Sequence, residues 1–185
     1  MKAFDLELVN GRLVTSAGIH EVDVGIREGR VAAIGAWGTF PGAEEIVDLT
    51  GRVILPGGID THVHGGDPGA FDFGEVSMAA ALGGVTTIVD MPIQIPLTTD
   101  AASFDAKLDV IGPKAYVDFA LWATLAPDGA GAIRELKERG AVGIKLVMQR
   151  SVEGVMPLHR DGEILEAFAE LQVVGLPAAI HAESQ

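Results

Sequence analysis

The sequence predicts a mixed α/β protein in which a small β-layer precedes a parallel sheet built from strand–helix units. Over residues 1–55, short alternating strands are separated by tight turns, whereas from Pro56 onward apolar strands alternate with amphipathic helices. The chain is 48% hydrophobic and 21% charged, and 24 glycines punctuate its apolar runs, which is typical of a globular protein with a sizeable core. We therefore expect two domains, residues 1–55 and 56–185.

The first segment contains two turn signals between alternating stretches. Asn10-Gly11 is a strong hairpin signal, and Glu28-Gly29 marks a second reversal. The resulting sheet has too few strands to close on itself. The strands expected here are residues 4–9, 12–14, 22–27, 30–34, 46–47 and 53–55.

The second segment follows the pattern of βα units. Asp100 is placed to cap a helix that Gly112 stops, and Asp161 begins another that ends before Gly175. Asp128 and Gly140 bracket a third. The strands expected are residues 58–62, 86–90, 116–121, 142–147 and 178–181, and the first helix lies near residues 74–82.

Five strand–helix steps leave the topology open between two folds. A (β/α)₈ barrel needs eight steps and about 250 residues, so the chain would end within such a barrel. A five-stranded doubly wound sheet fits the length equally well. The choice between them depends on the residues at the strand ends.

Charge and composition exclude several classes of partner. The formal net charge of −13 disfavours nucleic acid and anionic membrane surfaces, which need clustered Lys and Arg. Without cysteine, any metal has to be held by nitrogen and oxygen ligands. The first ten residues alternate like a strand and carry no basic and apolar leader, and no run approaches the length of a membrane span. We therefore expect a cytoplasmic protein with a small-molecule partner.

The sharpest functional signal is the His-x-His pair at His62 and His64, at the end of the expected strand 58–62. Side chains alternate along a strand, so both imidazoles point the same way and can reach one cation. A chance pair or two surface histidines would give the same pattern. We expect these two residues to be metal ligands.

Two further residues on the expected strands carry candidate chemistry. Lys145 lies in the apolar stretch 142–148, where burial lowers a lysine pKa and gives a neutral amine able to capture CO₂ as an anionic carbamate. On spacing alone, a lysine whose amine reaches water is the stronger interpretation. His181 closes the strand 178–181, where barrel enzymes place catalytic groups, but a core histidine fits as well. His20 and His159 fall in loops and are given no role.

Four stretches resemble the cyclic amidohydrolases, the group that includes dihydroorotase, allantoinase and hydantoinase/dihydropyrimidinase. They occur in that family's order and roughly its spacing, and together they cover nearly the whole chain. The matching stretches are Pro56-Gly57-Gly58-Ile59-Asp60-Thr61-His62-Val63-His64, Gly83-Gly84-Val85-Thr86-Thr87-Ile88-Val89-Asp90-Met91-Pro92, Gly143-Ile144-Lys145 and His181-Ala182-Glu183.

The resemblance implies a β-sandwich portion in residues 1–55 and the first five strands of a metal-dependent (β/α)₈ barrel in residues 56–185. It implies two zinc ions, one held by His62 and His64 and the other by His181, with carboxylated Lys145 bridging them. Asp60, two residues before His62, is the candidate for a catalytic role through orienting the metal site. A further His ligand and an Asp general base would lie beyond Gln185.

Departures from the family pattern favour an allantoinase-like substrate. The Arg and Asn by which dihydroorotases grip a carboxylate are replaced here by Gly66 and Ile93, and the Tyr of hydantoinases by Arg150. Allantoinases carry Met-Pro-Leu-Asn where this chain has Met91-Pro92-Ile93-Gln94, which makes Gln94 a candidate substrate-binding residue. The loop Ser151-Val152-Glu153-Gly154-Val155-Met156-Pro157 also resembles an allantoinase loop.

The implied reaction is hydrolysis of a ring amide, in a cyclic ureide such as allantoin, by a hydroxide held between two metals. Hydantoinase-like, dihydropyrimidinase-like or dihydroorotase-like activity, a non-catalytic scaffold, and an open α/β binding protein are the alternatives. We expect the complete protein to be a homo-oligomer. We expect the 185-residue chain alone to be inactive, because the sixth-strand His and eighth-strand Asp are not in it.

Overall fold

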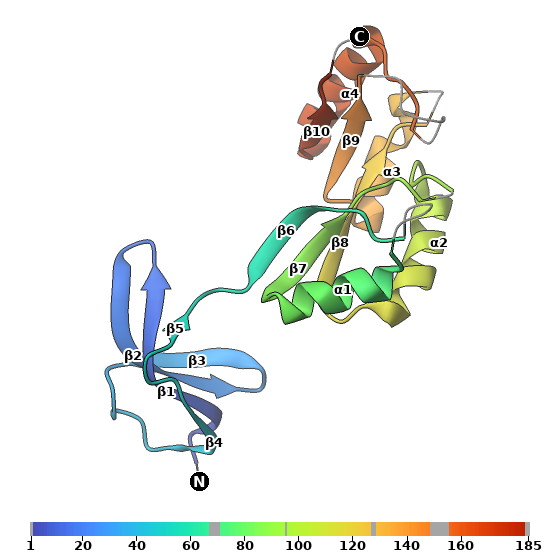
Figure 1. The fold of residues 1–185 in the computed structure, drawn as a ribbon. Helices are drawn as coiled ribbons and strands as arrows, with labels where there is room; N and C mark the ends of the chain where they lie inside the picture. The colour runs from blue at the N-terminus through green and yellow to red at the C-terminus, as the bar shows by residue number, and fades with distance from the viewer. Residues whose placement is uncertain (1, 67–70, 95, 127–128, 149–155, 184–185) are drawn as a thin grey trace. The chain divides into compact units, whose positions relative to one another are not determined.

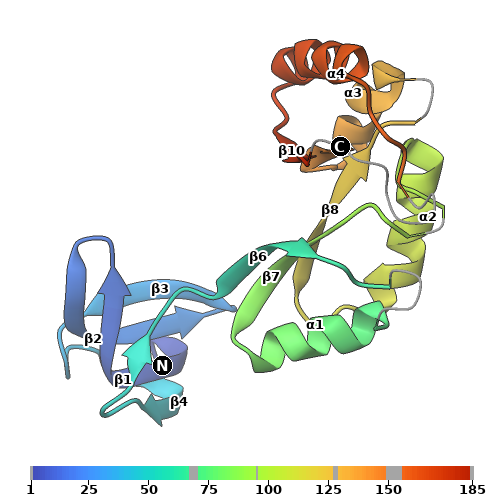
Figure 2. The ribbon, with the colours of Figure 1, turned by 45° about the horizontal axis from the view of Figure 1, so that its top comes forward.

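The structure is a computed structural model that describes residues 2–66, 71–94, 96–126, 129–148 and 156–183. Contacts within the chain define two compact units, Met1–Pro56 and Gly57–Gln185. Both units appear in Figure 1 and, turned by 45°, in Figure 2. Across the described ranges, helices long and apolar enough to cross a membrane are absent.

The first unit is a single five-stranded sheet in the order β3-β2-β1-β4, with β5 also paired to β1. β1 is antiparallel to β2 and parallel to β4 and β5, so the sheet is mixed. The strands are β1 Phe4–Thr15, β2 Gly18–Arg27, β3 Arg30–Gly35, β4 Ala43–Asp48 and β5 Val53–Ile54.

The hairpin expected at Asn10-Gly11 is wrong, because β1 runs through these residues and reverses only between Thr15 and Gly18. Asn10 adopts a left-handed backbone with φ 58°, and the register shifts on either side of it. Its N–H donates to Asp23 Oδ1 at 2.8 Å. Asn tolerates a positive φ, which suits it to tight turns. In this strand the same property allows a β-bulge.

The second unit is a five-stranded parallel sheet in chain order, β6-β7-β8-β9-β10, the pattern of the first five strands of a (β/α)₈ barrel. α1 and α2 lie along the same face of the sheet in both ribbon views (Figures 1 and 2). The strands are β6 Gly58–Val63, β7 Val85–Asp90, β8 Asp118–Thr124, β9 Gly143–Val147 and β10 Ala178–His181. The helices are α1 Phe73–Leu82, α2 Ala101–Ile111, α3 Ile133–Arg139 and α4 Asp161–Val174, with short 3₁₀ turns at Gly112–Lys114 and Ala130–Ala132.

The helix ends follow the capping residues of the sequence. Asp100 accepts a hydrogen bond from Ser103 N–H at 2.8 Å and caps α2. Gly140 and Gly175 end α3 and α4 in the left-handed conformation, which glycine adopts without a Cβ penalty. Asp128, expected at the start of α3, lies outside the described residues.

β8 begins two residues later than the sequence predicts and extends three residues further. The N–H groups of Tyr116 and Val117 donate to Ser77 Oγ of α1, at 2.7 and 3.3 Å. Because these two N–H groups bond to a helix side chain, pairing with β7 starts only at Asp118. The buried residues of β8 then continue to Ala123 and Thr124.

Side chains of the second sheet alternate between two faces, one that packs against the helices and one that carries the candidate site residues. The side facing the helices carries Val63, Ile88, Leu121, Ile144 and Leu146, all buried in the main apolar cluster. Neighbouring positions on the same strands face the other way. These positions include His62, Trp122, Lys145 and His181.

Candidate metal site

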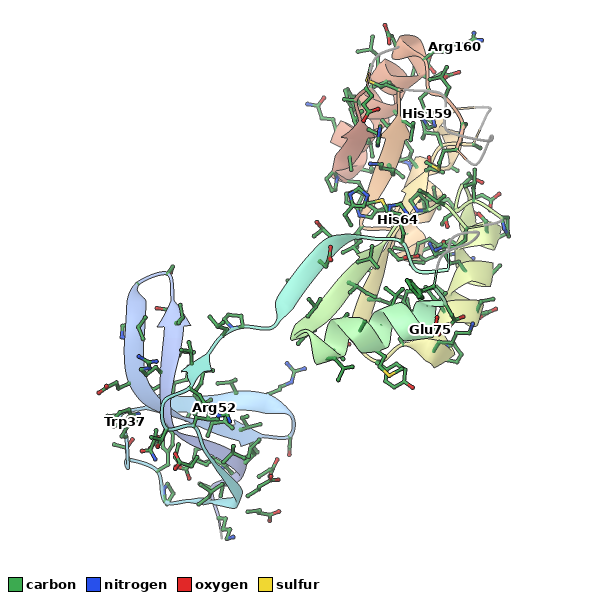
Figure 3. The ribbon with its side chains drawn as sticks, in the orientation of Figure 1. Trp37, Arg52, His64, Glu75, His159 and Arg160 are labelled. Atoms are coloured by element: carbon green, nitrogen blue, oxygen red, sulfur yellow. The ribbon has the colours of Figure 1, made fainter. Side chains whose placement is uncertain are left out.

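His62 and His64 lie at the carboxyl end of β6, where the chain leaves the sheet (His64 is labelled in Figure 3). Their Nε2 atoms are 3.2 Å apart, so both ring nitrogens point at the same small region. Asp60 Oδ1 accepts a hydrogen bond from the backbone N–H of His62 at 3.0 Å. Asp60 therefore contacts the backbone that carries the first histidine.

Lys145 is buried in the middle of β9 with 7% of its surface exposed. Its neighbours Ile144 and Leu146 are fully buried on the opposite side. Thr124 Oγ1 of β8 donates to the Lys145 carbonyl at 2.8 Å and fixes the backbone there. Desolvation lowers the pKa of the Lys145 amine, which favours its neutral form.

His181 ends β10 on the same side of the sheet as Lys145. The register pairs Ala179 with Lys145, and His181 is two residues further along, so both side chains face the same way. His181 Nε2 lies 3.3 Å from Glu183 Oε1 but makes no hydrogen bond with a described residue. The His181 side chain is 42% exposed and offers a ring nitrogen as a candidate metal ligand.

Burial and neighbouring charges both act on the His62 imidazole. The pKa of His62 is lowered, mainly by desolvation, then by the positive charges of Lys145 and His64 and to a smaller extent of His181, while Asp60 opposes the shift. The charges that act on His62 thus come from β9 and β10 as well as from its neighbour His64. Among the residues described, no three His, Cys, Asp or Glu side chains gather closely enough to hold a metal.

Gln94 lies in the loop after β7, with its amide turned toward the backbone. Its Nε2 donates to the Gly65 carbonyl at 2.6 Å and to Asp90 Oδ2 at 2.8 Å. Its Oε1 is buried and has no partner within the described structure. The nitrogen is therefore committed to the loop after His64, and only the oxygen remains for another group.

Sequence reasoning missed a second set of polar residues around the site. Lys107 is buried on α2, and Asp90 is fully buried at the end of β7. The sequence did contain a signal for the burial of Lys107. Lys107 lies three residues after Phe104 and four before Ile111, which places it on the apolar face of the helix.

Trp122 and His159 were also missed. The indole N–H of Trp122 donates to the Thr61 carbonyl at 2.9 Å, joining β8 to β6. His159, labelled in Figure 3, is 4% exposed, and its Nδ1 accepts the N–H of Val147 at 3.0 Å at the end of β9. No sequence pattern distinguishes a loop histidine that makes this contact from an exposed one.

Comparison with known proteins fixes the family. The sequence pattern of the amidohydrolase family matches residues 53–185. The chain belongs to the amidohydrolase family. An L-hydantoinase from Paenarthrobacter aurescens and an allantoinase from Rubrobacter xylanophilus are each 39% identical to it, over 98% and 100% of this chain.

Solved structures of this amidohydrolase's relatives show the same fold. The L-hydantoinase (dihydropyrimidinase) from Arthrobacter aurescens matches 98% of the chain with a TM-score of 0.90 and 38% identity. That match confirms the expected barrel strands and excludes the doubly wound sheet. The chain spans 41% of the length of each of these relatives. Residues 149–155, which include Arg150 and most of the allantoinase-like loop, lie outside the described residues.

Proposed function

We propose that the protein hydrolyses a ring amide of a cyclic ureide, using divalent metal ions held by His62, His64, Lys145 and His181. The observation that carries the proposal is the 3.2 Å approach of the His62 and His64 Nε2 atoms at the end of a barrel strand in a member of the amidohydrolase family. Strand alternation puts the Lys145 and His181 side chains on the same side of their strands, which supports it. The relatives named allantoinase and L-hydantoinase support a cyclic amide as the substrate class.

The residues present fit a two-metal centre. Imidazole nitrogens are good zinc ligands, and the 3.2 Å approach of the His62 and His64 nitrogens directs both to one point. Lys145, with its lowered pKa, is suited to carboxylation. The carbamate would offer two anionic oxygens as metal ligands and would replace a cation by an anion at this position.

The chemistry divides between the metals and the residues of this chain. When bound, zinc ions would make a water nucleophilic near neutral pH and polarise the carbonyl of the scissile amide. Asp60 would keep His62 in position through its backbone N–H. Gln94, through its Oε1, is the candidate to accept a hydrogen bond from a ring N–H of the substrate.

Two substrate types remain in competition. The Ile93-Gln94 dipeptide favours an allantoin-like ureide. The L-hydantoinase is as similar to this chain as the allantoinase is, at 39% identity, which keeps a hydantoin as the second candidate substrate. A dihydroorotate-like acid fits less well, since Gly66 and Ile93 offer no cationic or amide side chain to a carboxylate. We also propose that the complete protein is a homo-oligomer in the cytoplasm and that its partner is this small molecule.

The test is ring opening by the intact protein, prepared without metal and then reconstituted with zinc. Allantoin, 5-substituted hydantoins and dihydroorotate are offered separately, and the open-chain ureido product is quantified. We expect zinc-dependent turnover of one of the first two and none in His62→Asn. A protein that binds zinc at His62 and His64 yet opens none of these rings would point to the scaffold alternative. Metal-independent turnover would refute the mechanism.

A further inference from the structure

A buried ion pair lies on the helix-facing side of β7, opposite the candidate metal ligands. Asp90 is fully buried and Lys107 is 7% exposed. Asp90 Oδ2 and Lys107 Nζ are 2.7 Å apart. Lys107 Nζ also donates to the Met91 carbonyl at 2.7 Å. The pair therefore connects α2 to the end of β7.

The carboxylate of Asp90 also holds the backbone immediately after His64. Asp90 Oδ1 accepts the N–H of Gly65 at 2.7 Å, and Gln94 Nε2 donates to the Gly65 carbonyl at 2.6 Å. A Cβ at position 65 would lie 2.7 Å from Phe73 and 3.1 Å from Asp90 Oδ1, so only glycine allows this close approach. Both polar backbone groups of residue 65 are thereby fixed.

The residue before His64 is anchored as well. The Val63 carbonyl accepts the N–H of Met91 at 2.8 Å. His64 is therefore held between two anchored neighbours, Val63 on one side and Gly65 on the other. These contacts fix the backbone on both sides of His64.

Packing alone does not explain charges at this depth. A buried ion pair costs desolvation free energy, and apolar side chains of similar volume commonly serve a core as well or better. The charged pair adds a directed acceptor for the Gly65 N–H, which no apolar pair supplies. Lys107 compensates the charge of that acceptor where water cannot.

We propose that Asp90 and Lys107 are a positioning pair for the candidate metal site. Lys107 fixes the Asp90 carboxylate, and the carboxylate fixes Gly65, so that the His64 ring stays directed at the point toward which His62 also points. The inference rests on the proposed function, because the residue that it positions is a proposed metal ligand. Outer partners of metal ligands commonly change metal affinity by about 10- to 100-fold.

Two double variants of the intact protein separate the acceptor from the charge. Asp90→Leu with Lys107→Met removes both and keeps the bulk, whereas Asp90→Asn with Lys107→Met removes the charges but keeps an oxygen facing Gly65. Zinc affinity is measured by competition with a chromophoric chelator, well below the melting temperature of each metal-free protein. Hydrogen exchange of the peptide covering residues 62–66 is followed in the same metal-free samples.

We expect the Leu/Met variant to lose at least about tenfold in zinc affinity and to exchange faster at residues 62–66, while the Asn/Met variant stays within a few-fold of wild type. Leu171→Ala, in the core at α4, is the matched control that lowers the melting temperature without changing zinc affinity. Equal affinities in wild type and both double variants would overturn the positioning role. Wild-type protein that binds no zinc would remove the proposed function and this inference together.

Discussion

Replacing Gly143 with alanine should disturb the candidate site through Trp122. Gly143 pairs with Trp122 across β8 and β9, and a Cβ built on it lies 2.1 Å from Trp122 Cζ3 and 2.9 Å from the Pro177 carbonyl oxygen. Ordinary contact begins near 3.4 Å, so the indole has to move by about 1.3 Å. That movement strains or breaks its 2.9 Å hydrogen bond to the Thr61 carbonyl, one residue before His62.

The expected cost combines two terms. Forcing an extra methyl group into a filled space costs about 1–3 kcal/mol. Losing a hydrogen bond of this kind adds about 0.5–1.5 kcal/mol. We therefore expect Gly143→Ala to lower the free energy of unfolding of the metal-free intact protein by about 1.5–4.5 kcal/mol in urea denaturation. Zinc affinity should fall as well, because Thr61 adjoins the first ligand.

Gly162→Ala is the matched control for the same chemical change. Gly162 lies in the first turn of α4, and a Cβ there meets nothing within 4 Å. Alanine should be neutral or stabilise the helix by up to about 1 kcal/mol. Equal stability and equal zinc affinity for Gly143→Ala and wild type would refute the reasoning from the Trp122 contact.

Three further outcomes are expected of the intact protein. Lys145→Ala should lower the zinc content by at least one ion per chain, measured by atomic emission, whereas the exposed Lys114→Ala should leave it unchanged. Burial lowers the pKa of His159, so the unfolded state binds a proton at this residue more tightly than the folded state does. The wild-type protein should therefore lose stability as the pH falls below about 6.5, the usual pKa of histidine. In thermal melts this loss should be steeper for wild type than for His159→Gln. Asp100→Ala should cost about 1 kcal/mol in urea denaturation at neutral pH, because the Ser103 N–H at the start of α2 loses its cap.

The sequence by itself determined the order of elements and the side of the sheet on which chemistry lies. Hydrophobic periodicity and the capping residues Asp100 and Gly175 located the helices to within a few residues, because these signals act through neighbours in the chain. The period of two along a strand placed His62 and His64 on one side. Lys145 and His181 were candidates from their strands, and the resemblance to the family made metal ligands of them.

Tertiary structure decided what depends on partners distant in sequence. Asn10 makes a bulge and not a hairpin because Asp23, thirteen residues away, accepts its N–H. β8 starts at Asp118 because Ser77 of α1 binds the two preceding N–H groups. In each case the local propensity was correct and a distant polar group selected among the conformations it allows.

The surroundings of the candidate ligands also depend on the tertiary structure. Asp90 and Lys107 are 17 positions apart in the chain, and their pairing follows from α2 packing over the end of β7. Burial of Lys145, which lowers the pKa of its amine, likewise depends on the strands on either side of it. A sequence shows which side chains can carry charge. The fold decides which of them lose water, and it is that loss that makes a lysine neutral or an aspartate require a partner.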